Sequence, residues 1–280
     1  MLAAYLRPAR LEEALEALAT RPLTVLAGGT DHYPARVGRD PEEDILDLTA
    51  LASLRGISRT QAGWRIGAAA SWTEIIEARL PPLFDALKLA AREVGGVQIQ
   101  NAGTVAGNLC NASPAADGVP ALLALDASVE LASGRGSRIV PLEDFILGPR
   151  KTARGADELV TAVLVPEPRH EARSHFLKLG ARKYLVISIS MVAIVLETEQ
   201  GTVRAARIAV GACSPVARRL PSLEKALEGR RLDDKLPELV RPEHVEALQP
   251  IDDVRSSADY RRHAATVLVR RGLQSLAGRG

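Results

Sequence analysis

Residues 25–32 read Val-Leu-Ala-Gly-Gly-Thr-Asp-His, and this stretch decides the fold that we expect for the chain. It continues an apolar run that starts at Leu23 and is typical of a strand. Paired glycines allow a tight turn and bring backbone N–H groups close to a ligand, because no Cβ intervenes. Successive N–H groups in such a turn form a concave anion site that suits a pyrophosphate. Taken alone, a Gly-Gly pair after a strand is more often only a turn.

A second stretch is rich in small, amide and hydroxyl residues and has almost no charge before Asp117. Its first part, residues 98–108, reads Gln-Ile-Gln-Asn-Ala-Gly-Thr-Val-Ala-Gly-Asn, and residues 111–117 read Asn-Ala-Ser-Pro-Ala-Ala-Asp. A solvated loop usually carries Lys or Glu, so we expect a loop against whose main chain a ligand lies. The side chains expected to bind it are Thr104, Asn108, Ser113 and Asp117. Two such loops suit a two-ended ligand such as a dinucleotide; the alternative is a buried polar turn between two sheets.

These motifs resemble the FAD-binding subunit of the molybdenum hydroxylases, the family of aerobic carbon monoxide dehydrogenase and xanthine dehydrogenase. The resemblance rests on A-G-G-T-D (27–31), Q-I-x-N-x-G-T-x-x-G-N (98–108) and S-P-x-x-D (113–117). It extends to F-L-K-L-G-A-R (176–182) and D-V-R-S-S-A-D-Y-R-R (253–262), and so covers essentially the whole chain. The chain departs from the family at Gln100, where Arg is frequent, and at Ala106, where Gly is frequent. The Ala106 methyl matters only if a positive φ is required there.

The resemblance implies an FAD-dependent oxidoreductase subunit that transfers electrons. Its partners would be a molybdopterin-containing large subunit and a two-iron two-sulfur small subunit, and its FAD would pass electrons from iron–sulfur clusters to an acceptor (NAD, oxygen or quinone-linked). The pyrophosphate would lie on the first stretch, and Asp117 would bind a ribityl or ribose hydroxyl. Lys178 would be a cation near the flavin. The FAD-binding residues implied are Val25, Leu26, Ala27, Gly28, Gly29, Thr30, Asp31, His32, Thr104, Val105, Ala106, Gly107, Asn108, Asp117, Val160 and Lys178.

The pattern of apolar residues predicts an α+β protein with an α/β N-terminal subdomain. Residues 9–48 alternate helix and strand with short links, which predicts a small parallel sheet. By resemblance, residues 1–168 form a two-subdomain FAD-binding fold of the vanillyl-alcohol oxidase type, with subdomains of about 1–55 and 56–168. Residues 169–280 form a C-terminal antiparallel sheet with helices. The strands expected there are 175–179, 184–197 and 203–211, with a hairpin turn at Gln200-Gly201. The helices expected there are 222–227, with Ser222 as N-cap, and 257–273.

Composition excludes several functions. The 280 residues carry a net charge of +2 and only 3% aromatic residues, so neither nucleic acid nor an anionic membrane surface is an expected partner. The two cysteines are too few for an iron–sulfur cluster and fit a reducing cytoplasm. The five histidines are scattered, which predicts no metal site. The longest apolar run, residues 184–196, is too short for a transmembrane helix, which takes about 20 residues.

No catalytic residue is expected on this chain. No serine lies in a Gly-x-Ser-x-Gly elbow, and no nucleophile–base pair is visible in the sequence. Two alternatives stay open at this point. The chain could be a cofactor-free scaffold subunit of such a complex, which Ala106 favours. It could also be a stand-alone flavin oxidase, which would need its own substrate pocket and a Tyr, His or Cys near the flavin ring.

Overall fold

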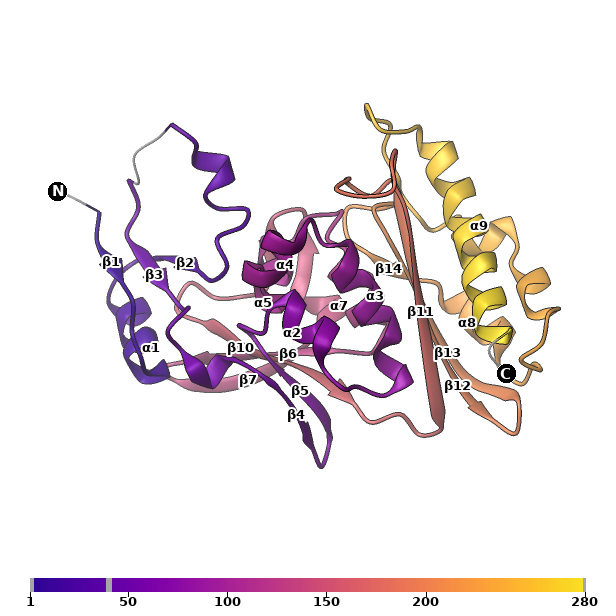
Figure 1. The fold of residues 1–280 in the computed structure, drawn as a ribbon, viewed down its shortest axis with the longest axis horizontal. Helices are drawn as coiled ribbons and strands as arrows, with labels where there is room; N and C mark the ends of the chain where they lie inside the picture. The colour runs from indigo at the N-terminus through magenta and orange to yellow at the C-terminus, as the bar shows by residue number, and fades with distance from the viewer. Residues whose placement is uncertain (1–2, 39–41, 279–280) are drawn as a thin grey trace.

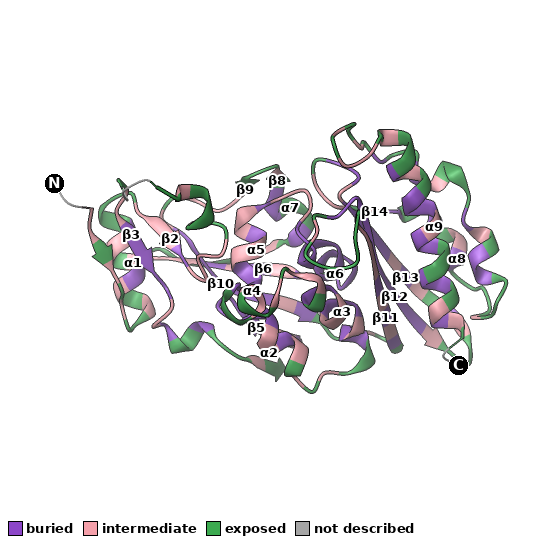
Figure 2. Cartoon of the chain, turned by 45° about the horizontal axis from the view of Figure 1, so that its top comes forward, coloured by how far each residue is buried: buried purple, intermediate pink, exposed green. Residues whose placement is uncertain are grey.

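The computed structural model describes residues 3–38 and 42–278, which form three larger sheets in sequence order along the long axis of the molecule and one two-stranded sheet (Figure 1). The N-terminal sheet lies at one end and the C-terminal sheet at the other. Buried side chains line the sheets and the helix faces turned toward them (Figure 2). They divide into three hydrophobic clusters.

The N-terminal sheet is parallel, in the order β1-β3-β2. Leu11, Ala14, Leu15 and Leu18 recur at helical spacing in α1 and pack toward this sheet, which confirms the predicted α/β unit. β2 is an edge strand, so its end is open to the rest of the molecule. The elements are β1 Tyr5–Leu6, α1 Leu11–Thr20, β2 Thr24–Leu26, η1 Pro34–Arg36, β3 Ile45–Asp47 and η2 Ala52–Leu54.

The central sheet is antiparallel, in the order β4-β5-β10-β6-β7. Its strands are β4 Ile57–Thr60, β5 Gly63–Gly67, β6 Ser128–Ser133, β7 Gly136–Pro141 and β10 Leu159–Pro166. A capping box starts α2, because the side chains of Ser71 and Glu74 each accept from the other's backbone N–H. The helices packed with this sheet are α2 Trp72–Glu77, η3 Pro82–Phe84, α3 Asp85–Glu93, α4 Val97–Ala102, α5 Val105–Asn111, α6 Gly118–Ala124 and α7 Leu142–Phe145.

The expectation that residues 98–108 form a loop is wrong. They fold into α4 and α5, joined by the two-residue link Gly103-Thr104. Thr104 is the N-cap of α5, and its hydroxyl oxygen accepts from the N–H of Gly107 at 3.0 Å. A run of small residues with a threonine cap is compatible with two short helices. Residues 103–106 are buried, whereas α4 has no buried residue.

The C-terminal sheet is antiparallel, in the order β11-β12-β13-β14, as predicted. Gln200 and Gly201 have φ of +51° and +70° in the β12–β13 turn, which confirms the hairpin. α8 and α9 lie along one face of this sheet (Figure 1). The elements are β11 Glu171–Leu179, β12 Ser190–Glu199, β13 Thr202–Gly211, β14 Arg218–Arg219, α8 Pro221–Leu227, η4 Leu236–Leu239, η5 Pro242–Val245 and α9 Ala258–Ala277.

Two further expectations are wrong in detail. Residues 184–189 do not belong to the strand, since β12 begins at Ser190 and the side chains of Tyr184, Leu185 and Ile187 are exposed. Ser222 is not an N-cap, because α8 begins at Pro221, whose fixed φ suits the first helical position. In the middle of the chain, β8 Ile146–Gly148 and β9 Lys151–Thr152 form a small hairpin.

Candidate functional site

The Gly-Gly bend follows β2 directly and carries a row of free backbone donors. Gly29 has a φ of +66°, and a Cβ there would lie 2.7 Å from the ring of Tyr33. The N–H groups of residues 28–32 donate to no acceptor in the described part of the chain. Consecutive N–H groups left free in a bend form an anion-binding concavity. The tight turn expected at the paired glycines is therefore present, and its binding of an anion stays a prediction.

The bend lies directly against the end of α4. A Cβ added to Gly28 would overlap the carbonyl oxygen of Ala102, so only glycine allows this approach. Beside the contact is a cavity of about 150 Å³. It is lined by both sequence stretches and by polar groups of their neighbours: Ala27, Gly28, Leu48, Thr49, Arg55, Ala69, Ser71, Asn101, Ala102 and Thr104. The two stretches are thus brought together, with a polar space between them.

The backbone of the second stretch is already hydrogen-bonded. The N–H groups of Val105 and Ala106 donate to the carbonyl oxygens of Ala70 and Ala68, at 2.9 and 3.2 Å. Those of the next two residues donate to Thr104. The N–H groups of residues 105–108 are therefore not available to a ligand. Ala106 is buried within α5 and has no positive φ, so its methyl group causes no strain.

Asn108 supplies the unmatched acceptor of this region. Its Oδ1 is buried and has no hydrogen-bond partner among the described residues. A buried amide oxygen without a partner costs about 1–3 kcal/mol, so such atoms usually have a ligand or water beside them. Together with the free N–H groups of the bend, this orphaned oxygen fits the polar contacts that a dinucleotide requires.

Asp117 and Lys178 form a buried ion pair. Lys178 Nζ donates to Asp117 Oδ2 at 2.7 Å, and the two side chains are only 6% and 10% exposed, Lys178 first. Lys178 also donates to the carbonyl oxygen of Glu93 at 3.2 Å. Burial raises the pKa of Asp117, while Lys178 and the hydroxyl of Ser188 act to lower it. Lys178 is therefore not a lone cation, because its charge is balanced by Asp117.

The remaining predicted residues lie in the strands β2 and β10 or in the bend after β2. Val25 and Leu26 lie in β2. Asp31 is exposed and pairs with Arg150 at 2.8 Å, across 119 residues of sequence. The ring of His32 packs edge-on against that of Tyr33. Val160 is 4% exposed in β10, next to a bulge in its pairing with β6.

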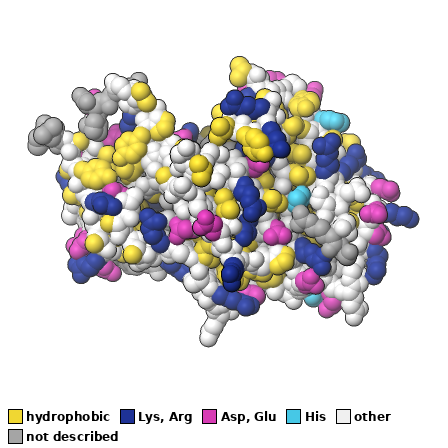
Figure 3. All heavy atoms as spheres, viewed as in Figure 1, with side chains coloured by type: hydrophobic (Ala, Val, Ile, Leu, Met, Phe, Trp, Pro, Cys, Tyr) yellow, Lys and Arg dark blue, Asp and Glu magenta, His cyan; other side chains and the backbone are white. Residues whose placement is uncertain are grey.

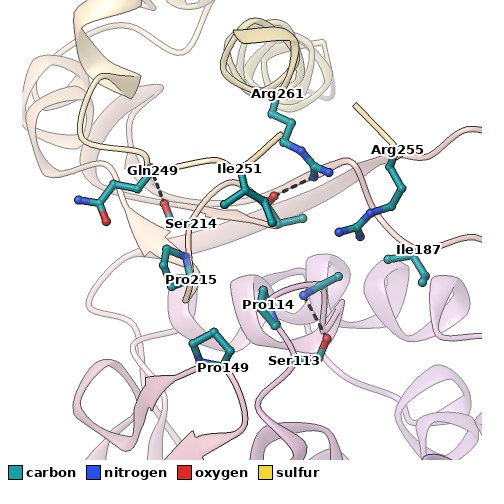
Figure 4. A pocket seen from close by; sticks show the side chains of 12 residues that line it. Ser113, Pro114, Pro149, Ile187, Ser214, Pro215, Gln249, Ile251, Arg255 and Arg261 are labelled. Atoms are coloured by element: carbon teal, nitrogen blue, oxygen red, sulfur yellow. Dashed lines mark hydrogen bonds between the residues drawn. The ribbon is translucent and has the colours of Figure 1, made fainter. Parts of the chain in front are cut away.

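A larger cavity of about 350 Å³ lies between residues 113–115 and the C-terminal part of the chain (Figure 4). Its walls are mostly apolar, with two arginines, Arg255 and Arg261, reaching in from the C-terminal part above Ser113 and Pro114. Both arginines bind Asp253. The cavity adjoins the S-P-x-x-D motif, four residues before Asp117.

Sequence reasoning missed several polar groups at these sites. Arg55 lines the smaller cavity, Arg150 binds Asp31, and Ser188 donates to Asp117. Ser188 was masked by the apolar run around it, although a serine inside such a run is itself a signal of a specific partner. No comparable local signal marks Arg55 or Arg150, whose contacts are set by distant parts of the chain.

The surface gives little further direction. Positive and negative side chains are interspersed on the face shown in Figure 3. Within residues 3–38 and 42–278, no three His, Cys, Asp or Glu side chains are grouped as a metal would need. In the same part of the chain, no helix has both the length and the apolar character to cross a membrane.

Comparison with known proteins accounts for both parts of the chain. Residues 2–168 match the family described as "FAD binding domain in molybdopterin dehydrogenase". Residues 175–276 match the family "CO dehydrogenase flavoprotein C-terminal domain". A xanthine dehydrogenase FAD-binding subunit from Escherichia coli O157:H7 is 31% identical over 278 residues, covering 96% of this chain and 94% of the relative.

Two carbon monoxide dehydrogenases are also similar. The medium chain from Hydrogenophaga pseudoflava is 28% identical over 257 residues, covering 90% of this chain and 88% of the relative. A solved structure of reconstituted CO dehydrogenase from Oligotropha carboxidovorans superposes with a TM-score of 0.88 at 27% identity, covering 100% of this chain and 99% of that one. The expected fold class, an FAD-binding part followed by a C-terminal antiparallel sheet with helices, is thereby confirmed.

Proposed function

The chain belongs to the FAD-binding subunits of the molybdenum hydroxylases, an oxidoreductase family, and from this premise we propose that it relays electrons within a larger complex. Residues 1–168 would be the FAD-binding domain, with subdomains of about 1–55 and 56–168. Residues 169–280 would be the C-terminal α+β domain. The observation that carries the proposal is the row of free N–H groups at residues 28–32, in a bend packed against the end of α4.

The FAD contacts are proposed to come from both sequence stretches and from the buried pair. The bend would hold the pyrophosphate through its N–H groups, since each free donor matches an anionic oxygen. The second stretch would contribute the Asn108 amide and the Thr104 hydroxyl. The full set is Val25, Leu26, Ala27, Gly28, Gly29, Thr30, Asp31, His32, Thr104, Val105, Ala106, Gly107, Asn108, Asp117, Val160 and Lys178.

The protein's own contribution would be binding and orientation. When bound, FAD supplies the redox chemistry, taking up electrons from iron–sulfur clusters and delivering them to NAD, oxygen or a quinone-linked acceptor. Asp117 would accept a hydrogen bond from a ribityl or ribose hydroxyl with the oxygen lone pairs that Lys178 and Ser188 leave free. Because Asp117 and Lys178 neutralise each other, they would fix the cofactor's position without adding net charge beside it.

The partners proposed are a molybdopterin-containing large subunit and a two-iron two-sulfur small subunit. Two observations support the proposal that this chain is one subunit of a larger enzyme. The curated relatives carry the names FAD-binding subunit and medium chain, and this chain covers 94% and 88% of two of them. Its two cysteines cannot hold an iron–sulfur cluster, which takes four thiolates, so the clusters must lie on another chain.

The experiment is a thermal unfolding series on the purified full chain stripped of flavin. FAD at about 100 times its dissociation constant should stabilise the folded state by about 2.7 kcal/mol. FMN, which lacks the adenylate half and with it the second phosphate, is the control and should stabilise much less. The FAD-loaded chain alone should not turn over xanthine or carbon monoxide with an artificial acceptor. Equal stabilisation by FMN, or steady turnover by this chain, would overturn the proposal.

A further inference from the structure

Ser188 is completely buried and contacts Asp117. Its hydroxyl donates to Asp117 Oδ1 at 2.7 Å, while Lys178 donates to the other carboxylate oxygen, Oδ2. The carboxylate is thus held by one neutral and one charged donor, on separate oxygens. This arrangement fixes both the rotation of the carboxylate and its distance from Lys178.

The backbone at Ser188 is itself clamped by the C-terminal part of the chain. Arg255 donates to the carbonyl oxygen of Ser188 at 3.3 Å, and Arg261 donates to that of Ile189 at 2.7 Å. Asp253 joins the two arginines, accepting from Arg261 at 2.7 Å and from Arg255 Nε at 3.0 Å. The Arg255 guanidinium holds the pKa of Asp253 well below its usual range, so the clamp stays charged at neutral pH.

The contacts that Arg255 and Arg261 make lie directly before the start of β12. β12 starts at Ser190, and the side chains of Tyr184, Leu185 and Ile187 before it are exposed. Ser188 and Ile189 lie between this irregular segment and the strand, and their carbonyl oxygens are the ones that the two arginines bind. These contacts therefore fix the backbone from which the Ser188 hydroxyl reaches Asp117.

We propose that Ser188 is a positioning residue for FAD, which orients the Asp117 carboxylate from a backbone held by Asp253, Arg255 and Arg261. This inference rests on the proposed function, in which Asp117 contacts the cofactor. Loss of the hydroxyl leaves Asp117 Oδ1 buried without its donor and frees the carboxylate to rotate toward Lys178. A hydrogen bond to a charged group accounts for about a tenfold difference in affinity, so Ser188→Ala should weaken FAD binding about tenfold.

The chain offers a matched control two residues away. Ser190 is buried to the same extent, and its hydroxyl contacts the thiol of Cys213 rather than Asp117. Ser190→Ala removes the same group two residues further along the chain and should leave FAD affinity unchanged. Ser188→Cys keeps the side-chain size with a weaker donor and should fall between the wild type and Ser188→Ala.

The test is FAD titration of the full chain and these three variants, repeated from pH 5 to 8. The charged groups that face Asp117 are Lys178 of β11 and Glu93 of α3, and both are unchanged in all variants. Because the Ser188 hydroxyl lowers the pKa of Asp117, its removal should move the acid limb of FAD binding to higher pH, which a general loss of stability would not do.

The outcomes separate this inference from the proposed function. Weaker binding in Ser188→Ala with a shifted acid limb, and unchanged binding in Ser190→Ala, support it. Unchanged binding in Ser188→Ala, or equal weakening in both alanine variants, overturns it while leaving the proposed function in place. If the wild-type chain binds no FAD, the proposed function fails and this inference fails with it.

Discussion

Lys178 reaches from β11 to Asp117, 61 residues earlier in the chain, and the two side chains form a 2.7 Å ion pair that is nearly sealed from solvent. The pair joins the C-terminal sheet to the start of α6 in the central part of the molecule. It therefore links the region that matches the FAD-binding family, residues 2–168, to the region that matches the C-terminal family, residues 175–276. A buried pair of this kind is sensitive to loss of either partner, because the other is left as an uncompensated charge.

Lys178→Met should destabilise the cofactor-free chain by about 3 kcal/mol, since Asp117 stays buried without its counter-ion. The measurement is urea unfolding of the cofactor-free protein. The control is the double variant Asp117→Leu/Lys178→Met, which removes both charges and should recover much of that stability. It should still not bind FAD. Recovery of FAD binding by the double variant would show that the pair is only structural.

Gly29→Ala should abolish tight FAD binding. Its φ of +66° disfavours any L side chain, and the added methyl group would collide with the ring of Tyr33. Gly229→Ala is the control, because Gly229 has a φ of +75° but open space around it and lies far along the chain at the end of α8. Both variants should lose about 1–2 kcal/mol of stability through backbone strain. Isothermal titration should show weakened FAD binding for Gly29→Ala alone, and similar losses in both variants would contradict this.

Ala106→Gly should not improve FAD affinity, although many relatives are expected to have glycine there. Ala106 lies inside α5 without a positive φ, so the glycine would lower stability by about 1 kcal/mol through its helix propensity. The measurements are the melting temperature of the cofactor-free chain and its FAD dissociation constant. A markedly tighter dissociation constant would show that the methyl group obstructs the cofactor after all.

Arg138→Met should destabilise the chain at neutral pH and much less at pH 3. Arg138 lowers the pKa of Glu158 to about 2 from its ordinary value of 4.5. A carboxylate with a lowered folded-state pKa contributes stability above its unfolded pKa and loses that contribution as pH falls toward the folded value. The difference in melting temperature between wild type and variant should therefore shrink as pH falls from 5 to 2. A constant difference across that range would exclude this linkage.

The elements with strong local signals were predictable from sequence. The strand before the Gly-Gly pair and the hairpin turn at Gln200-Gly201 follow from short-range chemistry and are confirmed. Residues 98–108 were misread because small polar residues suit both a ligand loop and short helices. The choice is decided by the Thr104 cap and by carbonyl oxygens of residues 68–70, which only the folded chain brings there.

Long-range polar contacts could not be predicted from the pattern. In the sequence, Lys178 is one charged residue in a predicted strand, and the residues next to it in the chain do not indicate that Asp117 is its partner. The apolar run at 184–196 predicted strand throughout, whereas the contacts of Arg255 and Arg261 hold residues 188 and 189 just outside β12. In both cases tertiary contacts override local preference. The resemblance supplied the residue positions, but not the network that connects them.

The central claim is that this chain by itself binds one FAD between the Gly-Gly bend and the segment that starts at Thr104. Its most direct test is an equilibrium titration of the flavin-free chain with FAD, in which quenching of the flavin fluorescence reports binding. The account predicts saturation at one FAD per chain, and loss of that saturation in Gly29→Ala. Absence of saturable binding by the folded wild-type chain, or unaltered binding by Gly29→Ala, would contradict it.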